Sequence, residues 1–163
     1  VELINTTLSN HKDLSIKAQI YNTDGTIAWE STELTDIKAN TVERLFTVPA
    51  PQNIKGVYFL KLSLYEKGNK VNSNIYWLTT EAKDYKTLAG LPKSVPQAHA
   101  DLKQSGANYS GSVHIKADKQ ISFFNRVKVF DKKTGKRILP VHYSDNYITL
   151  MPGDEQEIKL EFM

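Results

Sequence analysis

Residues 16–29 read IKAQIYNTDGTIAW. In the first half, Ile16, Ala18 and Ile20 alternate with Lys17, Gln19 and Tyr21. This period of two residues is typical of a half-buried β-strand. The NTDG segment that follows supplies side chains that favour a tight turn, and a second strand then runs to Trp29. The stretch therefore predicts a β-hairpin.

The same signals recur along the chain. Alternating apolar positions predict further strands, at Tyr58, Leu60, Leu62 and Leu64, at Val113, Ile115 and Ala117, and at Ile158, Leu160 and Phe162. Turn residues separate them, at 67–69, 133–135 and 152–154. No segment long enough for a typical helix carries a 3.6-residue apolar period, and only residues 80–91 are candidates for a helical or irregular stretch. The sequence predicts the all-β class.

A break in the strand pattern predicts two domains. Residues 88–96 read LAGLPKSVP, and their prolines and glycine do not fit a central sheet ladder. Residues 16–29 and 127–141 both read as strand, turn and strand, and each is followed by a polar turn and an amphipathic strand. Chance similarity between short β segments is a competing explanation. We expect two tandem immunoglobulin-like β-sandwich domains, at 1–88 and 89–163. The second either closes its sandwich differently or lacks its last strands.

Composition narrows the functional classes. The 163 residues carry a formal charge of +3 with acidic and basic side chains interleaved, so we expect no nucleic-acid partner. No apolar run reaches the length of a membrane span, and we expect no membrane partner. The absence of cysteine excludes disulfides, thiolate catalysis and cysteine-based zinc sites. The first residues resemble neither an initiator methionine nor a signal peptide, so we expect a fragment or a processed product.

The ionisable residues do not predict a catalytic site. Most of the 18 acidic residues fall in expected turns or on outward strand positions. His11, His99, His114 and His142 lack the spacing of metal ligands, and a surface or cross-strand role is expected for the two on strands. Residues 110–112 read SGS without the context of an esterase nucleophile. We expect no catalytic residue, no metal and no cofactor, and hence no enzyme activity in this chain alone.

Aromatic residues are the candidates for sugar contacts, because a sugar ring stacks on a flat side chain. Trp29 and Trp77 are expected in core or sheet-covering positions, with Tyr76 facing outward. Residues 143–147 read YSDNY and place two tyrosines, a carboxylate and an amide in one loop. The candidate carbohydrate-binding residues are therefore Tyr143, Asp145, Asn146 and Tyr147. Alternatively, Asp145 and Asn146 form an Asx-type turn and the tyrosines pack inward.

Two longer motifs resemble a known family. Residues 74–79 read NIYWLT before the proline-rich linker, and residues 137–154 read RILPVHYSDNYITLMPGD. They are similar to the C-terminal immunoglobulin-like domains of glycoside hydrolase family 2, in its exo-β-glucosaminidase and β-mannosidase branch. The resemblance implies a parent enzyme in which a TIM barrel upstream holds two catalytic glutamates. No glutamate of this chain matches their motif.

The resemblance favours one function among three. It implies a non-catalytic C-terminal accessory region of an exo-glycosidase that removes β-linked glucosamine or mannose from oligosaccharide ends. The expected partners are the upstream catalytic TIM barrel of the same polypeptide and oligosaccharide, in a secreted or periplasmic bacterial setting. The alternatives are an adhesive stalk of tandem sandwiches and an independent carbohydrate-binding module, both without hydrolysis.

Overall fold

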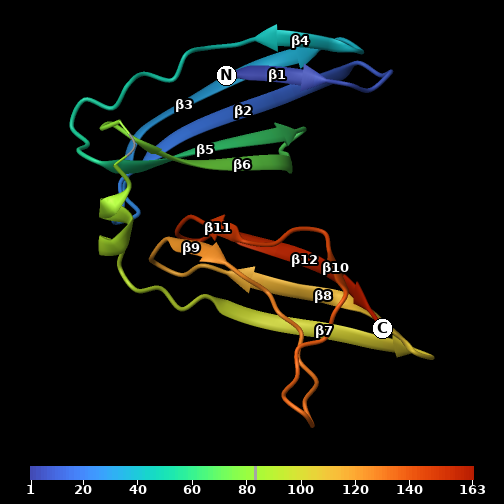
Figure 1. Cartoon of the computed structure of the whole chain (residues 1–163). Coiled ribbons are helices and arrows are strands. Elements are labelled where there is room, and N and C mark those ends of the chain that lie inside the picture. Colours follow the sequence, from blue (N-terminus) through green and yellow to red (C-terminus); the bar gives the residue numbers. More distant parts are fainter. Residues whose placement is uncertain (83) are drawn as a thin grey trace. The chain divides into compact units, whose positions relative to one another are not determined.

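The computed structural model describes residues 1–82 and 84–163 (Figure 1). It divides into two compact units, Val1–Leu91 and Pro92–Met163. The predicted end of the first domain, residue 88, falls inside a short 3-10 helix, η1 (Lys86–Gly90), in the stretch expected to be helical or irregular. In the described part of the chain, no helix has the length and hydropathy needed to cross a bilayer.

The first unit is a sandwich of a four-stranded and a two-stranded sheet, in the orders β3-β2-β5-β6 and β1-β4. Its strands are β1 (Glu2–Asn5), β2 (His11–Tyr21), β3 (Ile27–Ile37), β4 (Thr41–Arg44), β5 (Val57–Glu66) and β6 (Asn69–Thr79). Leu14, Ile16 and Ile37 form a buried cluster with apolar residues of β1 and of the segment that follows β4, including Leu3 and Leu45. The predicted hairpin is thus β2–β3, and its apolar face is the core of the unit.

The second unit also has two sheets, in the orders β10-β12-β8-β7 and β11-β9. Its strands are β7 (Gln97–Ser105), β8 (Asn108–Lys116), β9 (Ser122–Asn125), β10 (Val141–Tyr143), β11 (Ile148–Leu150) and β12 (Glu155–Phe162). Their core joins Ile115 and Ala117 to Ile148, Leu150 and Ile158. The outer strand β7 is exposed along its whole length. The all-β class and the immunoglobulin-like fold predicted from the sequence are confirmed.

Two details of the predicted fold are wrong. The two strands expected within residues 127–141 do not form: in the described structure Phe130 and Arg137 make an isolated bridge, and only Val141 lies in a strand, as the first residue of β10. Pro140 has no N–H to donate to a ladder. Trp77 is 38% exposed rather than a core residue, because β6 is the outer strand of its sheet. Tyr76 is exposed as expected, and Trp29 is half-buried.

Candidate carbohydrate-contact surface

The loop between β10 and β11 carries the four residues predicted to contact sugar. Tyr143 ends β10 and is half-buried against the core cluster of the second unit. Its ring therefore contributes to packing, as the structural alternative for the tyrosines predicted. The remaining three residues lie beyond the strand, where the chain turns towards β11.

Asn146 fixes the loop to the neighbouring chain. Its Oδ1 accepts hydrogen bonds from the N–H groups of Val127 (2.8 Å) and Tyr147 (3.0 Å). Its Nδ2 donates to the carbonyl oxygen of Val127 at 3.1 Å. These bonds hold the amide against the backbone of the next residue and of Val127, rather than two residues on as in an Asx-type turn. The amide of Asn146 therefore positions the loop, and its donors and acceptor are directed at protein.

Asp145 is exposed and links the loop to β12. One carboxylate oxygen accepts the N–H of Asn146 at 2.7 Å, and the other accepts a hydrogen bond from Nε2 of Gln156 at 2.8 Å. A carboxylate has about four lone-pair positions, so two well-placed bonds leave it able to accept from a sugar hydroxyl.

Tyr147 presents its ring at the surface together with two residues that the sequence did not single out. Its ring centroid lies 5.1 Å from that of Phe124, and the guanidinium carbon of Arg126 lies 5.2 Å from the Tyr147 centroid. The two rings are 44% and 47% exposed. We call Phe124, Arg126 and Tyr147 the aromatic patch. It combines two flat apolar faces with a cation that donates hydrogen bonds.

The backbone at the aromatic patch is strained. Phe124 and Tyr147 have φ values of 57° and 59°, in the left-handed region that bulky L-residues rarely occupy. Such strain costs about 1–3 kcal/mol per residue and is concentrated at functional sites in proteins. The pairing of Asn125 with Ile148 in β9–β11 places the two rings side by side. The structure thus brings Tyr147 together with Phe124 and Arg126 at the surface. Tyr143 instead packs against the core, and Asn146 bonds to the backbone.

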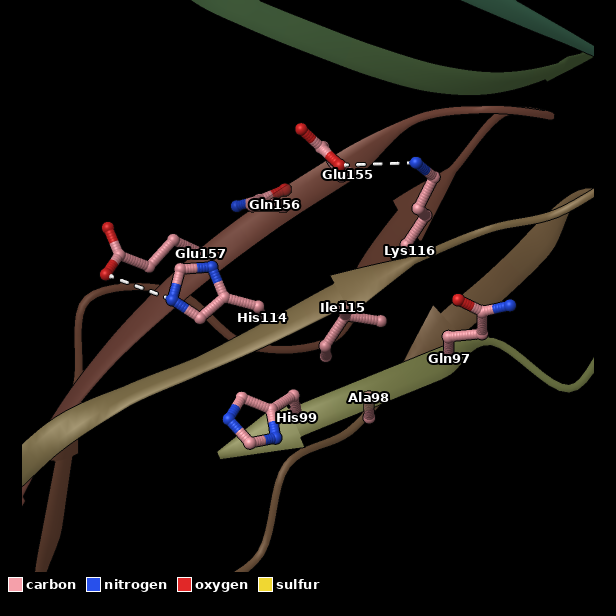
Figure 2. A pocket seen from close by; sticks show the side chains of 9 residues that line it. All are labelled: Gln97, Ala98, His99, His114, Ile115, Lys116, Glu155, Gln156 and Glu157. Carbon is pink, nitrogen blue, oxygen red and sulfur yellow. Dashed lines mark ion pairs between the residues drawn. The ribbon is translucent and has the colours of Figure 1, made fainter. Parts of the chain in front are cut away.

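A hollow of about 600 Å³ lies on the polar side of β7, β8 and β12 (Figure 2). Figure 2 shows two cross-strand pairs in it: His114 with Glu157, and Lys116 with Glu155, each with a nitrogen–oxygen distance of 3.6 Å. His99 stands opposite His114 on β7. Exposed pairs of this kind are screened by water and contribute at most about 1 kcal/mol each.

The charged hollow does not have the chemistry of a glycosidase site. A glycosidase general acid requires a carboxyl group held protonated by its surroundings beside a second carboxylate. Glu155 and Glu157 are instead exposed to water, beside Lys116 and His114 respectively. Within residues 1–82 and 84–163, no group of three or more ionisable side chains is arranged to bind a metal ion. His114 has the cross-strand role expected from the sequence.

Comparison with known proteins gives the family. The family described as "Exo-beta-D-glucosaminidase Ig-fold domain" matches residues 74–163, and "Mannosidase Ig/CBM-like domain" matches residues 1–84. The chain belongs to these two domain families. The resemblance found in residues 74–79 and 137–154 is thereby confirmed, and the chain is an immunoglobulin-like accessory region of the kind found in exo-β-glucosaminidases and mannosidases.

Full-length relatives place this region within much longer polypeptides. The chain is 27% identical to the exo-β-D-glucosaminidase of Arthroderma benhamiae and 26% identical to that of Amycolatopsis orientalis. Both alignments cover 99% of this chain, but 20% and 18% of the respective relatives. The chain therefore spans about a fifth of the length of these relatives.

Solved structures show the same arrangement of strands. The exo-chitosanase CsxA of Amycolatopsis orientalis matches 99% of this chain with a TM-score of 0.87 and 26% identity, over 22% of its own chain. The β-D-mannosidase of Dictyoglomus thermophilum matches 94% of this chain with a TM-score of 0.59 over 17% of its own, and at 18% identity it shows the fold alone. Nearly every residue of this chain is thus aligned with a region of the exo-chitosanase CsxA.

Proposed function

We propose that this chain is the non-catalytic accessory region of an exo-glycosidase that removes β-linked glucosamine or mannose from oligosaccharide ends. The observation that carries the proposal is the alignment of 99% of the chain with exo-β-D-glucosaminidases, together with the TM-score of 0.87 to CsxA. Glucosamine is the first choice of sugar, because two relatives that align with 99% of the chain are exo-β-D-glucosaminidases.

The proposed partner is a catalytic TIM barrel in the same polypeptide. The relatives are single polypeptides in which the region matched here is a small part, which leaves ample length for such a domain. Glu155 and Glu157 on β12 are exposed and lie beside Lys116 and His114, so hydrolysis is assigned to the barrel and support of it to this region. Secretion or export to the periplasm belongs to the proposal, and fractionation of the producing cells tests it.

The proposed contact of this region with substrate is the aromatic patch. The C–H face of a sugar ring packs on the exposed rings of Phe124 and Tyr147, and Arg126 donates to its hydroxyls. Asp145, in the same loop, supplies an acceptor. Tyr143 and Asn146 keep the loop in place.

The first experiment assays the complete polypeptide that contains this chain on an aryl β-glucosaminide and an aryl β-mannoside. The proposal expects hydrolysis of at least one substrate, and the faster reaction names the sugar. Loss of hydrolysis on replacing the paired glutamates of the barrel would assign the reaction to that domain. A polypeptide made of further sandwiches that hydrolyses neither substrate would contradict the proposal and favour the adhesive stalk.

The second experiment tests the aromatic patch with Tyr147→Ala in the complete polypeptide. We expect KM for an oligosaccharide to rise about tenfold, equivalent to ~1.4 kcal/mol, while kcat/KM for the small aryl glycoside stays unchanged. Leu139→Ala, at an exposed residue of the same unit, is the matched control and leaves both values unchanged. Equal KM values for the wild type and Tyr147→Ala would remove the patch from the proposal.

A further inference from the structure

The first unit contains a cavity that none of the above assigns. Its volume is about 520 Å³, within the range of about 300–1,000 Å³ typical of small-molecule sites. Three stretches line it: residues of the β2–β3 hairpin, the start of β3 around Trp29, and residues 49–54, which connect β4 to β5. It lies entirely in the first unit, whereas the aromatic patch is in the second.

Trp29 forms one wall of this cavity. It is half-buried in β3, opposite Ile20 of β2, whose side chain also lines the cavity and is 1% exposed. Trp29 is therefore held on its strand beside a residue of the unit's core. A flat ring fixed in this way offers a stacking surface and an N–H donor without first losing much side-chain entropy.

Three of the residues that line the cavity carry amide side chains: Asn22, Gln52 and Asn53. Asn22 is held by Thr26, to whose Oγ1 its Nδ2 donates at 2.9 Å, while the backbone N–H of Asn22 donates to the carbonyl of Thr26 at 2.9 Å. Gln52 and Asn53 are exposed. Each amide offers both donors and an acceptor, which are the groups that hydroxyls need.

The opposite wall is stiff. Pro49 and Pro51 line the cavity in the segment that carries Gln52 and Asn53. A proline ring fixes φ, so this segment has fewer alternative backbone conformations to lose when a ligand binds. The cavity thus combines a supported ring, a stiff apolar wall and amides on its rim.

The cavity is also free of charge. None of the ten residues that line it is Asp, Glu, Lys, Arg or His. The hollow on β7, β8 and β12 differs in this respect, because it contains two glutamates, a lysine and two histidines. A ligand ammonium or phosphate group would lose its hydration in the neutral cavity without gaining a counter-charge. The chemistry therefore selects a ligand that is rich in hydroxyls and carries no charge.

We propose that the Trp29 cavity is a binding site for a neutral sugar unit, such as a β-linked hexose of an oligosaccharide. The sugar stacks its C–H face on the Trp29 indole and exchanges hydrogen bonds with the amides of Asn22, Gln52 and Asn53. A glucosamine unit, whose ammonium finds no carboxylate here, binds more weakly. This site is independent of the function proposed above, because it requires neither a catalytic barrel nor the aromatic patch.

The test is an NMR titration of the 15N-labelled 163-residue chain with β-1,4-linked mannotriose and, separately, with the β-1,4-linked glucosamine trisaccharide. The chain has two tryptophans, so the indole N–H signal of Trp77 is an internal control for that of Trp29. We expect mannotriose to shift the Trp29 signal in a saturable way and to leave that of Trp77 in place. The glucosamine trisaccharide is expected to need a several-fold higher concentration.

Variants separate binding from folding. Trp29→Phe is expected to weaken mannotriose binding several-fold, and Gln52→Ala with Asn53→Ala to weaken it further without unfolding, because both amides are exposed. Trp77→Phe and Leu139→Ala, at exposed residues that do not line the cavity, are matched controls and retain binding. An unshifted Trp29 signal at saturating sugar, equal affinity for the two trisaccharides, or unchanged affinity in Gln52→Ala/Asn53→Ala would overturn the proposal. None of these outcomes bears on hydrolysis by the complete polypeptide.

Discussion

The two turns that looked like repeats in the sequence share their chemistry. In the first unit, Oδ1 of Asp24 accepts hydrogen bonds from the backbone N–H and the hydroxyl of Thr26, at 2.9 and 2.6 Å. In the second unit, Oδ1 of Asp131 accepts the same two bonds from Thr134, both at 2.7 Å. In each turn, the threonine hydroxyl is the main reason that the pKa of the aspartate lies below its ordinary value.

The flanks of these turns have little in common. The first turn joins β2 and β3, two strands of eleven residues each, with Ile20 buried beside the turn. The second is closed by a single bridge at Phe130, which is 53% exposed. The difference teaches that turn residues define only a local conformation. Strands extend from a turn only where their side chains reach a core and their edges reach a neighbouring strand.

The largest expected effect compares the apolar flanks. Ile20→Ala removes a fully buried side chain and is expected to lower the free energy of unfolding by about 2–5 kcal/mol. Leu139→Ala, in the second hairpin, removes a side chain that is 65% exposed and is expected to change it by less than about 0.5 kcal/mol. Urea denaturation of both variants measures the values. Comparable losses would show that the second hairpin is part of a core.

The second-largest expected effect is the loss of stability on removing the hydrogen bonds that hold Val127, at the start of the second hairpin. At Val127, where a strand ladder would be expected, both backbone groups bond to the side chain of Asn146. Asn146→Ala leaves those groups without their partners and is expected to cost about 1–3 kcal/mol. Hydrogen exchange at Val127 should accelerate in parallel. Asn146→Asp retains the acceptor and loses the donor, so it should fall between the wild type and the alanine variant.

The smallest effect tests the shared turn chemistry. Thr26→Val and Thr134→Val each remove the hydroxyl donor, so the pKa of Asp24 or Asp131 should rise towards the ordinary value of 3.8. A lowered pKa in the folded state stabilises the protein above the unfolded-state value, and this stabilisation is lost as the pH falls through the folded-state pKa. NMR titration of the carboxyl carbons below pH 3.8 measures the shift. Each variant should leave the other aspartate unaffected.

Sequence reasoning succeeded where the signal was local. The alternation at residues 16–20 predicted β2 because a sheet covered on one side requires it, and the motif at residues 137–154 identified the domain family. It failed for residues 127–140, because a strand pattern does not say whether a neighbouring strand exists. Trp77 was assigned to the core for a similar reason, since the sequence does not distinguish an outer strand from a central one.

The candidate site was predictable only in part. Residues 144–146, SDN, predicted a turn, and the side chain of Asn146 accepts a backbone hydrogen bond there. Phe124 and Arg126 lie more than twenty positions from Tyr147 in the sequence, and only the pairing of β9 with β11 brings the three side chains together. The signal available in the sequence was the consecutive pair Phe123 and Phe124. In an extended segment, one of two neighbouring side chains must point away from the core, which could have predicted an exposed ring here.

The exposure of β7 determines how the second unit behaves as a separate protein. An outer strand has one row of backbone N–H and C=O groups directed away from its sheet, and a strand of another molecule can pair with it. Asp101 and Lys103, in the middle of β7, oppose this pairing because the approaching strand must partly dehydrate their charges. Neutralising both would favour edge-to-edge pairing of β7 with a strand of another molecule.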